Sequence, residues 1–315
     1  MRESLKQGLR VGLQTTWTLG KVIFPITLLV SILQHTWILD WIIEFITPAM
    51  GVFGLRGDAA IPLVLGNFLN LYAGIGAILS LELTVKEVFI LAVMLSFSHN
   101  LIIESTVASK VGIKMWVILL VRVGLATFSA IIINFLWQGG SEVAKYGFIA
   151  STDESISGFW PIVFDGIEKA SLGVLQLALI VIPLMIVIQI MKDRGWLQVF
   201  SKWMAPVTRL LGMKENTSMT LVAGLTIGLA YGAGVMIQAV KEDGVSKRDL
   251  TLAFIFLVAC HAVVEDTLIF VPLGIPVIPL LLIRLFTAIF LTVLISFMWK
   301  EDAKVSTRKG AAYEN

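Results

Sequence analysis

Two short polar segments interrupt apolar sequence, and each places a histidine before acidic residues. The first, SHNLIIEST, contains His99 and Glu104; the second, CHAVVEDT, contains His261, Glu265 and Asp266. Ionisable groups between apolar runs of membrane-spanning length are costly and indicate function by default. Imidazole and carboxylate groups together bind divalent transition metals, and histidine also titrates near neutral pH. The segments therefore predict a metal-ion site or a proton relay that drives uptake of another solute.

The two segments match each other, which favours a functional over a purely structural role. In the structural alternative, each histidine only donates to a backbone carbonyl freed where a helix breaks. A cysteine beside the second histidine would add a softer metal ligand. The residues predicted for metal binding or proton relay are His99, Glu104, Cys260, His261, Glu265 and Asp266.

Two arginines lie within the apolar stretches that follow these segments. Arg122 and Arg284 predict a pair of intramembrane ion pairs, Arg122 with Glu104 and Arg284 with Asp266. The functional alternative is that the arginines dock an anionic substrate, which would compete with transport of a cation.

Glycine-rich apolar stretches precede each histidine segment: GNFLNLYAGIGAIL and GLTIGLAYGAGVMI. Their glycines permit close backbone approach, but small residues at such spacings also serve helix packing. Both interpretations stay open for the polar residues on these stretches, which are Asn67, Asn70, Tyr72, Thr226 and Tyr231. We expect Gln176, Gln189 and Gln238 to be structural.

Composition indicates a polytopic membrane protein. Of the 315 residues, 57% are hydrophobic and only 15% are charged, against about 25% charged in soluble domains. Several apolar stretches have a length near or above the roughly 20 residues that cross a bilayer. They are residues 172–191, 250–264 with their continuation, and 278–298. The net charge of +2 argues against a nucleic-acid partner. The basic N-terminus MRESLKQGLR predicts a retained cytoplasmic segment.

The chain contains two similar halves. A shift of 158 positions aligns Pro25 with Pro183, Pro48 with Pro206, and the glycines at 54, 66, 74 and 76 with those at 212, 224, 232 and 234. After four extra residues at 241–244, a shift of 162 aligns His99 with His261, Arg122 with Arg284, and Trp137 with Trp299. Such uncommon residues in one order indicate an internal duplication.

Each half predicts the same elements. A proline-containing apolar segment (22–41; 172–191) precedes an amphipathic interfacial helix, WILDWIIEFITPAM or WLQVFSKWMAPVTRLL. The glycine-rich stretch, the histidine segment and a closing helix follow. If the glycine-rich stretch is a re-entrant hairpin, each half crosses three times and the halves are inverted. This arrangement places 17 of the 24 Lys and Arg residues on the cytoplasmic side, in agreement with the positive-inside rule.

The duplicated G-x7-G-x-G stretch with its trailing histidine segment resembles the nucleoside-recognition (Gate) family, which is related to membrane domains of ferrous-iron permeases and concentrative nucleoside transporters. The resemblance covers nearly the whole chain and implies that each hairpin and the broken helix after it form a solute site. The chain departs from these relatives in two ways. It lacks the soluble GTPase of the iron permeases, and on the first hairpin it has GNFLN where the nucleoside transporters have a Gln-Thr/Ser-Glu run. The implied site residues are Asn67, Asn70, His99, Asn100 and Glu104, facing Tyr231, His261, Glu265 and Asp266.

The sequence therefore predicts an all-α polytopic protein of two inverted repeats, each with about three transmembrane helices, an interfacial helix and a re-entrant hairpin. The predicted divisions are 1–139 and 161–300 for the repeats, 140–160 for an extracytoplasmic linker and 301–315 for a cytoplasmic tail. We expect the protein to lie in the inner (plasma) membrane with both termini in the cytoplasm. Its expected partners are the lipid bilayer and a small polar or ionic solute, and a homo-oligomer is compatible with the sequence. A wet polar cavity between the hairpins would favour transport, and a dry centre would exclude it.

The expected function is secondary transport of a small polar or ionic solute by alternating access. The histidines and acids favour a divalent metal ion as the cargo. The alternatives are a nucleoside or small organic anion coupled to protons or sodium, and a non-transporting membrane assembly partner like the spore-maturation proteins. The sequence shows no ATPase motif and no nucleophile beside a base, so we expect no enzymatic activity and no cofactor beyond a cargo or coupling ion.

Overall fold

The computed structural model describes residues 2–33, 35–147 and 158–299. Apart from one isolated bridge between Thr84 and Val143, this part of the chain forms only helices and turns. Five helical segments are long and apolar enough to cross a membrane: Arg2–Leu33 (α1), Val85–Lys110, Met115–Leu136 (α7), Phe159–Asp193 (α8) and Val277–Met298 (α14). The predicted all-helical membrane class is confirmed.

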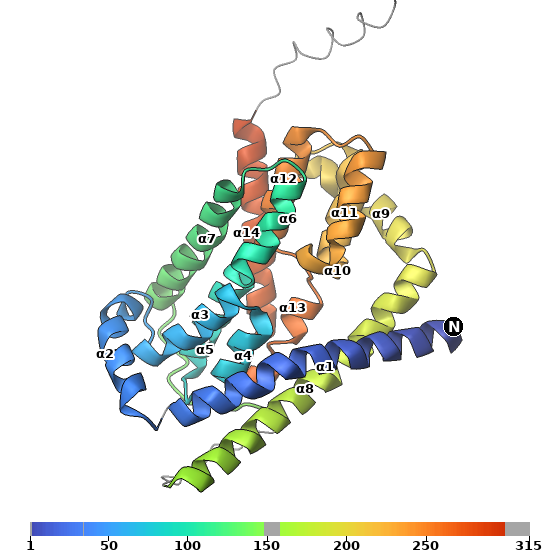
Figure 1. Cartoon of the computed structure of the whole chain (residues 1–315). Coiled ribbons are helices and arrows are strands. Elements are labelled where there is room, and N and C mark those ends of the chain that lie inside the picture. Colours follow the sequence, from blue (N-terminus) through green and yellow to red (C-terminus); the bar gives the residue numbers. More distant parts are fainter. Residues whose placement is uncertain (1, 34, 148–157, 300–315) are drawn as a thin grey trace, which may run out of the picture.

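Helices α1 and α8 lie side by side along the molecule (Figure 1). A Cβ atom added at Gly8 would lie 2.6 Å from Cα of Ile186, and one at Gly166 would lie 2.8 Å from Cδ1 of Leu28. Residue numbers rise on one helix as they fall on the other, so the two helices run antiparallel. Glycine allows this close backbone approach, as it does in many membrane helix pairs.

The predicted start of the first apolar segment was wrong by about twenty residues. The amphipathic N-terminus is part of α1, which begins at Arg2, ends at Leu33 and is followed by α2 from Trp37. A helix of this length is stabilised mainly by packing. The similarly long α8 packs against α1 at Gly8 and Gly12 of α1. The apolar pattern from residue 22 marks only the more hydrophobic part of the helix.

The two amphipathic segments form helices α2 (Trp37–Gly51) and α9 (Trp196–Leu210). Each ends within a residue or two of the predicted segment, and each contains its proline. They lie at opposite ends of the molecule (Figure 1).

Each glycine-rich stretch forms a pair of short helices. The pairs are α3 (Ala60–Phe68) with α4 (Leu71–Ile78), and α10 (Ser218–Ile227) with α11 (Leu229–Glu242). A Cβ at Gly74 would lie 3.0 Å from the carbonyl oxygen of Pro62, so α4 folds back against α3. Gly228 has φ 86°, a left-handed conformation that permits the turn between α10 and α11.

Helices α5 (Val85–Ser98) and α12 (Lys247–Ala259) form the buried centre, with almost every residue inaccessible. Two shorter helices continue them, α6 (Leu101–Lys110) and α13 (Glu265–Leu268). The stretch from 250 to 264 and its continuation does not form one crossing helix as predicted, because α12 stops at Ala259.

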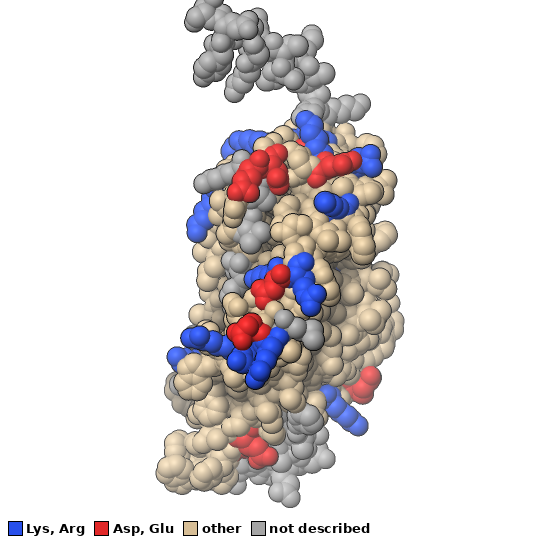
Figure 2. All heavy atoms as spheres, turned by 90° about the vertical axis from the view of Figure 1, so that its right-hand side faces the viewer, with Lys and Arg blue, Asp and Glu red and all other residues tan. Residues whose placement is uncertain are grey.

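Helices α7 and α14 bury matching stripes and expose apolar faces. The buried residues that match are Ile118, Arg122, Ala126 and Ala130 on α7, and Leu280, Arg284, Ala288 and Thr292 on α14. Their other faces expose large apolar side chains such as Phe128 and Phe286, as expected of helices in contact with lipid. Figure 2 shows a surface made mostly of residues other than Lys, Arg, Asp and Glu, with the charged ones in separate groups.

Part of the predicted linker pairs with the first turn of α5. The backbone N–H groups of Val85 and Lys86 donate to the carbonyls of Glu142 and Gly140, each at 2.9 Å. Residues 148–157 of this linker and the predicted tail 301–315 lie outside the described residues.

Candidate functional site

Both histidine segments break at their histidine, and in the same way. His99 follows the end of α5, and Asn100 after it has φ 53°; His261 follows Cys260 at the end of α12, and Ala262 has φ 41°. Asn100 and Ala262 are the non-glycine residues with positive φ in the described ranges. This conformation is uncommon, especially for alanine, and such local strain is a functional hint.

The hairpins hold the broken backbone in place. The N–H of Asn100 donates to the carbonyl of Gly66 at 2.8 Å, and the N–H of Ala262 donates to that of Gly224 at 3.0 Å. Backbone groups freed by a break must find such partners when water is excluded. Each histidine is therefore positioned jointly by a hairpin and by the break that follows it.

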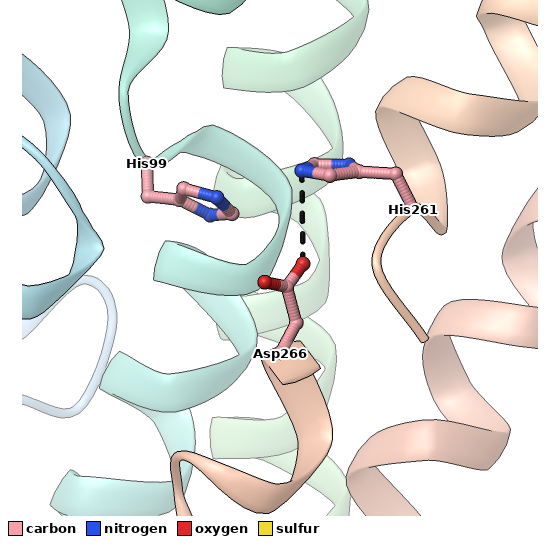
Figure 3. A group of neighbouring side chains, drawn as sticks. All are labelled: His99, His261 and Asp266. Carbon is pink, nitrogen blue, oxygen red and sulfur yellow. Dashed lines mark ion pairs between the residues drawn. The ribbon is translucent and has the colours of Figure 1, made fainter. Parts of the chain in front are cut away.

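The two imidazole rings meet, with their centroids 5.3 Å apart. His99 Nδ1 lies 2.6 Å from the carbonyl oxygen of Leu95, and His261 Nδ1 lies 2.8 Å from that of Leu257. A carbonyl oxygen only accepts, so each Nδ1 carries the proton and each Nε2 keeps a lone pair for a cation or a second proton. Figure 3 shows the rings facing each other, with Asp266 beside them.

Glu104 lies between the two histidines. Its Oε1 is 3.4 Å from Nε2 of His99, and its Oε2 is 3.3 Å from Nε2 of His261. Asp266 Oδ2 is 3.6 Å from the same His261 nitrogen. An unbroken helix would hold His99 and Glu104 on different faces, so the break at Asn100 creates this contact. Ligand atoms of His99, His261 and Asp266 lie within 4.8 Å of one another.

The arginines anchor the carboxylates, in the arrangement that the ion-pair interpretation predicts. Arg122 Nη2 donates to Glu104 Oε2 at 2.8 Å and to the carbonyl of His99. Arg284 Nη2 donates to Asp266 Oδ2 at 2.8 Å and to the carbonyl of His261 at 2.7 Å. Both arginines are fully buried, and neither lines the cavity described next.

A cavity of about 310 Å³ opens beside this cluster. Its wall contains the turns of both hairpins, both helix breaks and the middle of α1. Tyr72 reaches across it and donates to Glu265 Oε1 at 2.5 Å, which links the first hairpin to the second broken segment. The polar residues that line it are Thr18, Asn70, Tyr72, His99, Asn100, Glu104, His261, Glu265 and Asp266.

Three predicted residues lie away from this cavity. The amide of Asn67 donates to the Leu63 carbonyl, and the hydroxyl of Thr226 donates to that of Val222, both within their own helices. Cys260 is buried and lies outside the lining and the metal-ligand group. The side chain of Tyr231 lies outside the described part of the structure.

The glutamines predicted to be structural lie away from the cavity as well. Gln189 pairs with Asp193, and Gln238 pairs with Glu242, each on the surface of its own helix. Gln176 is buried in α8 against Gly147.

Sequence reasoning missed Thr18, Gly228 and Ala262 as cavity residues. The repeat could have found two of them, because Gly228 aligns with Asn70 and Ala262 with Asn100. Thr18 gives no such signal, because its role depends on where α1 crosses the two hairpins.

The fold and the site define an all-helical membrane protein whose broken helices carry ionisable residues into a central cavity. A sequence model of the Gate family, described as nucleoside recognition, matches residues 16–114 and 174–290. The chain therefore belongs to the Gate family. It is similar to an uncharacterized membrane protein, YvoD, of Bacillus subtilis (strain 168), with 67% identity over 301 residues that cover 96% of each chain. No solved structure matches the chain.

Proposed function

We propose that the protein is a secondary transporter that moves a divalent transition metal ion through the cavity between its two halves. One observation carries this proposal: the Nε2 atoms of His99 and His261 both converge on the carboxylate of Glu104. With each Nδ1 already protonated, the Nε2 atoms face anionic oxygens at both contacts. A cation, or a second proton on each ring, would make both contacts attractive.

The spacing suits a tetrahedral ion. Ligands at about 2.1 Å from zinc are separated by about 3.4 Å along each edge of the tetrahedron. Nε2 of His99 lies 3.4 Å from Glu104 Oε1, and Nε2 of His261 lies 3.3 Å from Glu104 Oε2 and 3.6 Å from Asp266 Oδ2, so each of these pairs has the length of one edge. The set of two imidazoles and carboxylates is also the ligand type that zinc, iron and manganese accept.

The surrounding groups have supporting roles. Backbone carbonyls fix both histidine tautomers, as outer partners of metal ligands commonly do. Arg122 and Arg284 orient Glu104 and Asp266 through Oε2 and Oδ2, the oxygens that also face His261, while Glu104 Oε1 faces His99. Because each arginine neutralises one carboxylate, the ion would be held weakly enough to leave again.

Several observations support inverted repeats and alternating access. Equivalent helices α1 and α8 run antiparallel, as two copies inverted in the membrane require, and the Gate matches begin 158 residues apart. Helices α3 and α4 have 9 and 8 residues, or about 13 Å at 1.5 Å per residue, too short to cross. Re-entrant hairpins that meet at broken helices are typical of transporters. We place the protein in the plasma membrane, with both termini cytoplasmic and a gradient driving uptake.

The size of the cavity favours a second candidate. Small-molecule pockets begin near 300 Å³, and this cavity holds about 310 Å³. The side chains of Asn70 and Asn100 line it, as a site for a nucleoside or small organic anion would require. In that case the histidines and Glu104 would relay the coupling protons instead of holding the cargo.

Uptake into proteoliposomes tests the proposal. We expect the full chain to carry zinc or manganese to a metal-sensitive dye inside the vesicles, and His99→Ala or His261→Ala to abolish this flux. His35→Ala is the matched control, because His35 is exposed at the turn after α1. Uptake of a labelled nucleoside without metal uptake would select the second candidate. Absence of any flux would reject transport in favour of a membrane assembly role.

A further inference from the structure

Helix α9 has one apolar face against the protein and another that is exposed. Its buried side carries Leu197 and Thr208, with Phe200 and Met204 partly buried. At about 100° per residue, five other apolar side chains fall within an arc of about 80° and form a stripe along the helix. They are Trp196, Val199, Trp203, Val207 and Leu210, of which Trp203 is 75% and Leu210 80% exposed.

Two cations flank this stripe. Lys202 and Arg209 are exposed and seven residues apart, so they lie about two turns apart on one line of the helix. This line is about 110° around the helix from the centre of the stripe and faces away from the protein. Arg209 also pairs with Glu215 at 3.0 Å. Apolar and basic faces in this order are typical of a helix that lies among lipid headgroups.

The equivalent helix of the first half has the opposite charge. The shift of 158 positions aligns Lys202 with Glu44 and Gln198 with Asp40, and α2 contains no lysine or arginine. Yet α2 also exposes aromatic side chains, with Trp37 78% and Phe45 79% exposed. Both helices therefore have the apolar groups that a bilayer attracts, and charge is the property that separates them.

The C-terminal end of α9 lies beside the start of α12 and the loop before it. Arg248, the second residue of α12, donates to the carbonyl of Gly212 just after α9 at 2.8 Å. Asn216 donates to the carbonyl of Asp243 in the same loop, also at 2.8 Å. The face turned toward the viewer in Figure 2 is the side of Figure 1 on which α9 lies, and it carries several groups of Lys and Arg with groups of Asp and Glu among them.

We propose that α9 is a binding surface for anionic phospholipids, with its apolar stripe among the acyl chains and Lys202 and Arg209 at the headgroup phosphates. Helix α2 binds lipid without this preference, because Glu44 stands where α9 has Lys202. Free phosphate lacks the acyl chains that the stripe would contact, so the ligand is the lipid and not the ion. This interaction is independent of which solute the cavity accepts.

Native mass spectrometry of the full chain in detergent, mixed with equal amounts of phosphatidylglycerol and phosphatidylcholine, tests the proposal. We expect preferential retention of phosphatidylglycerol, about fivefold per basic residue near the surface. Lys202→Glu, which copies the charge of α2, should reduce this preference by about fivefold or more, and Lys202→Gln with Arg209→Gln should abolish it. Gln198→Ala, which changes an exposed neutral residue of α9, is the matched control and should leave it unchanged.

Two results would overturn the proposal. One is equal retention of the two lipids by the unmodified chain, which would leave the stripe to a protein partner. The other is a preference that survives in the Lys202→Gln and Arg209→Gln double variant. Both side chains are exposed, so an unchanged melting temperature in detergent will show that these variants fold.

Discussion

Loss of the Arg122 side chain should strongly destabilise the protein. It is fully buried, and its guanidinium donates to the carbonyl of Phe97 at 2.8 Å, to that of His99 and to Glu104 at 2.8 Å. Methionine has a similar apolar stem but none of these donors. Arg122→Met therefore leaves Glu104 as a buried charge without its main partner.

The expected loss follows from the asymmetry between breaking and replacing a buried ion pair. Removing one partner of such a pair costs about 3–5 kcal/mol, because the other charge stays buried. We expect Arg122→Met to lower the free energy of unfolding by about that amount, and Arg284→Met to do the same through Asp266. Adding Glu104→Gln to Arg122→Met removes the uncompensated charge, so the double variant should be more stable than the single one.

Unfolding of the full chain in one detergent, followed by heat or denaturant, measures these differences. Lys110→Met is the matched control, because Lys110 is an exposed cation at the end of α6. A single variant as stable as this control, or a double variant no more stable than Arg122→Met, would refute the ion-pair reasoning. The arginine would then be available for an anionic solute.

Three further changes have distinct expected outcomes. Glu104→Gln keeps an acceptor for Arg122 but removes the negative charge between the two histidines. Calorimetry should therefore show metal affinity reduced by about 100-fold or more, which exceeds the 10–100-fold loss typical when a hydrogen-bond partner of a metal ligand is removed. Tyr72→Phe leaves the buried Glu265 oxygen without its hydroxyl donor, and stability should fall by about 1–3 kcal/mol in the unfolding assay. Gly228→Ala forces a side chain into φ 86°, which should cost about 1–2 kcal/mol in the same assay.

Two of these changes, Glu104→Gln and Gly228→Ala, have a control elsewhere in the chain. Glu82→Gln removes an exposed carboxylate outside the cavity and should leave metal affinity unchanged. Gly51→Ala adds a Cβ that meets no atom within 4 Å, so it should be nearly neutral where Gly228→Ala is not. Equal effects of a variant and its control would contradict the structural reason given for it.

The sequence predicted elements best where a local pattern specifies them. Helices α2 and α9 begin at the predicted tryptophans, because an amphipathic run with flanking turns is a local signal. The full extent of α1 was not predictable, because its N-terminal turns depend on glycine contacts with α8, far away in sequence.

The candidate site also has features that the sequence predicts and features that depend on the three-dimensional packing. The internal repeat identified His99 and His261 as a pair, and the aligned acids and arginines predicted which partners would meet. The bridging position of Glu104 could not be predicted, because it needs both the break at Asn100 and the packing of one half against the other. The side chains of Asn67 and Thr226 bond within their own helices, a choice that polarity and spacing alone do not decide.

X-ray absorption at the zinc edge tests most directly whether a cation is held between the two histidines. For zinc bound to the full chain, we expect nitrogen and oxygen neighbours at about 2.0–2.2 Å with the scattering of two imidazole rings. His99→Ala or His261→Ala should leave one ring, while His35→Ala should leave both. A spectrum without imidazole scattering, or one that is the same in all three variants, would contradict a metal site at this position.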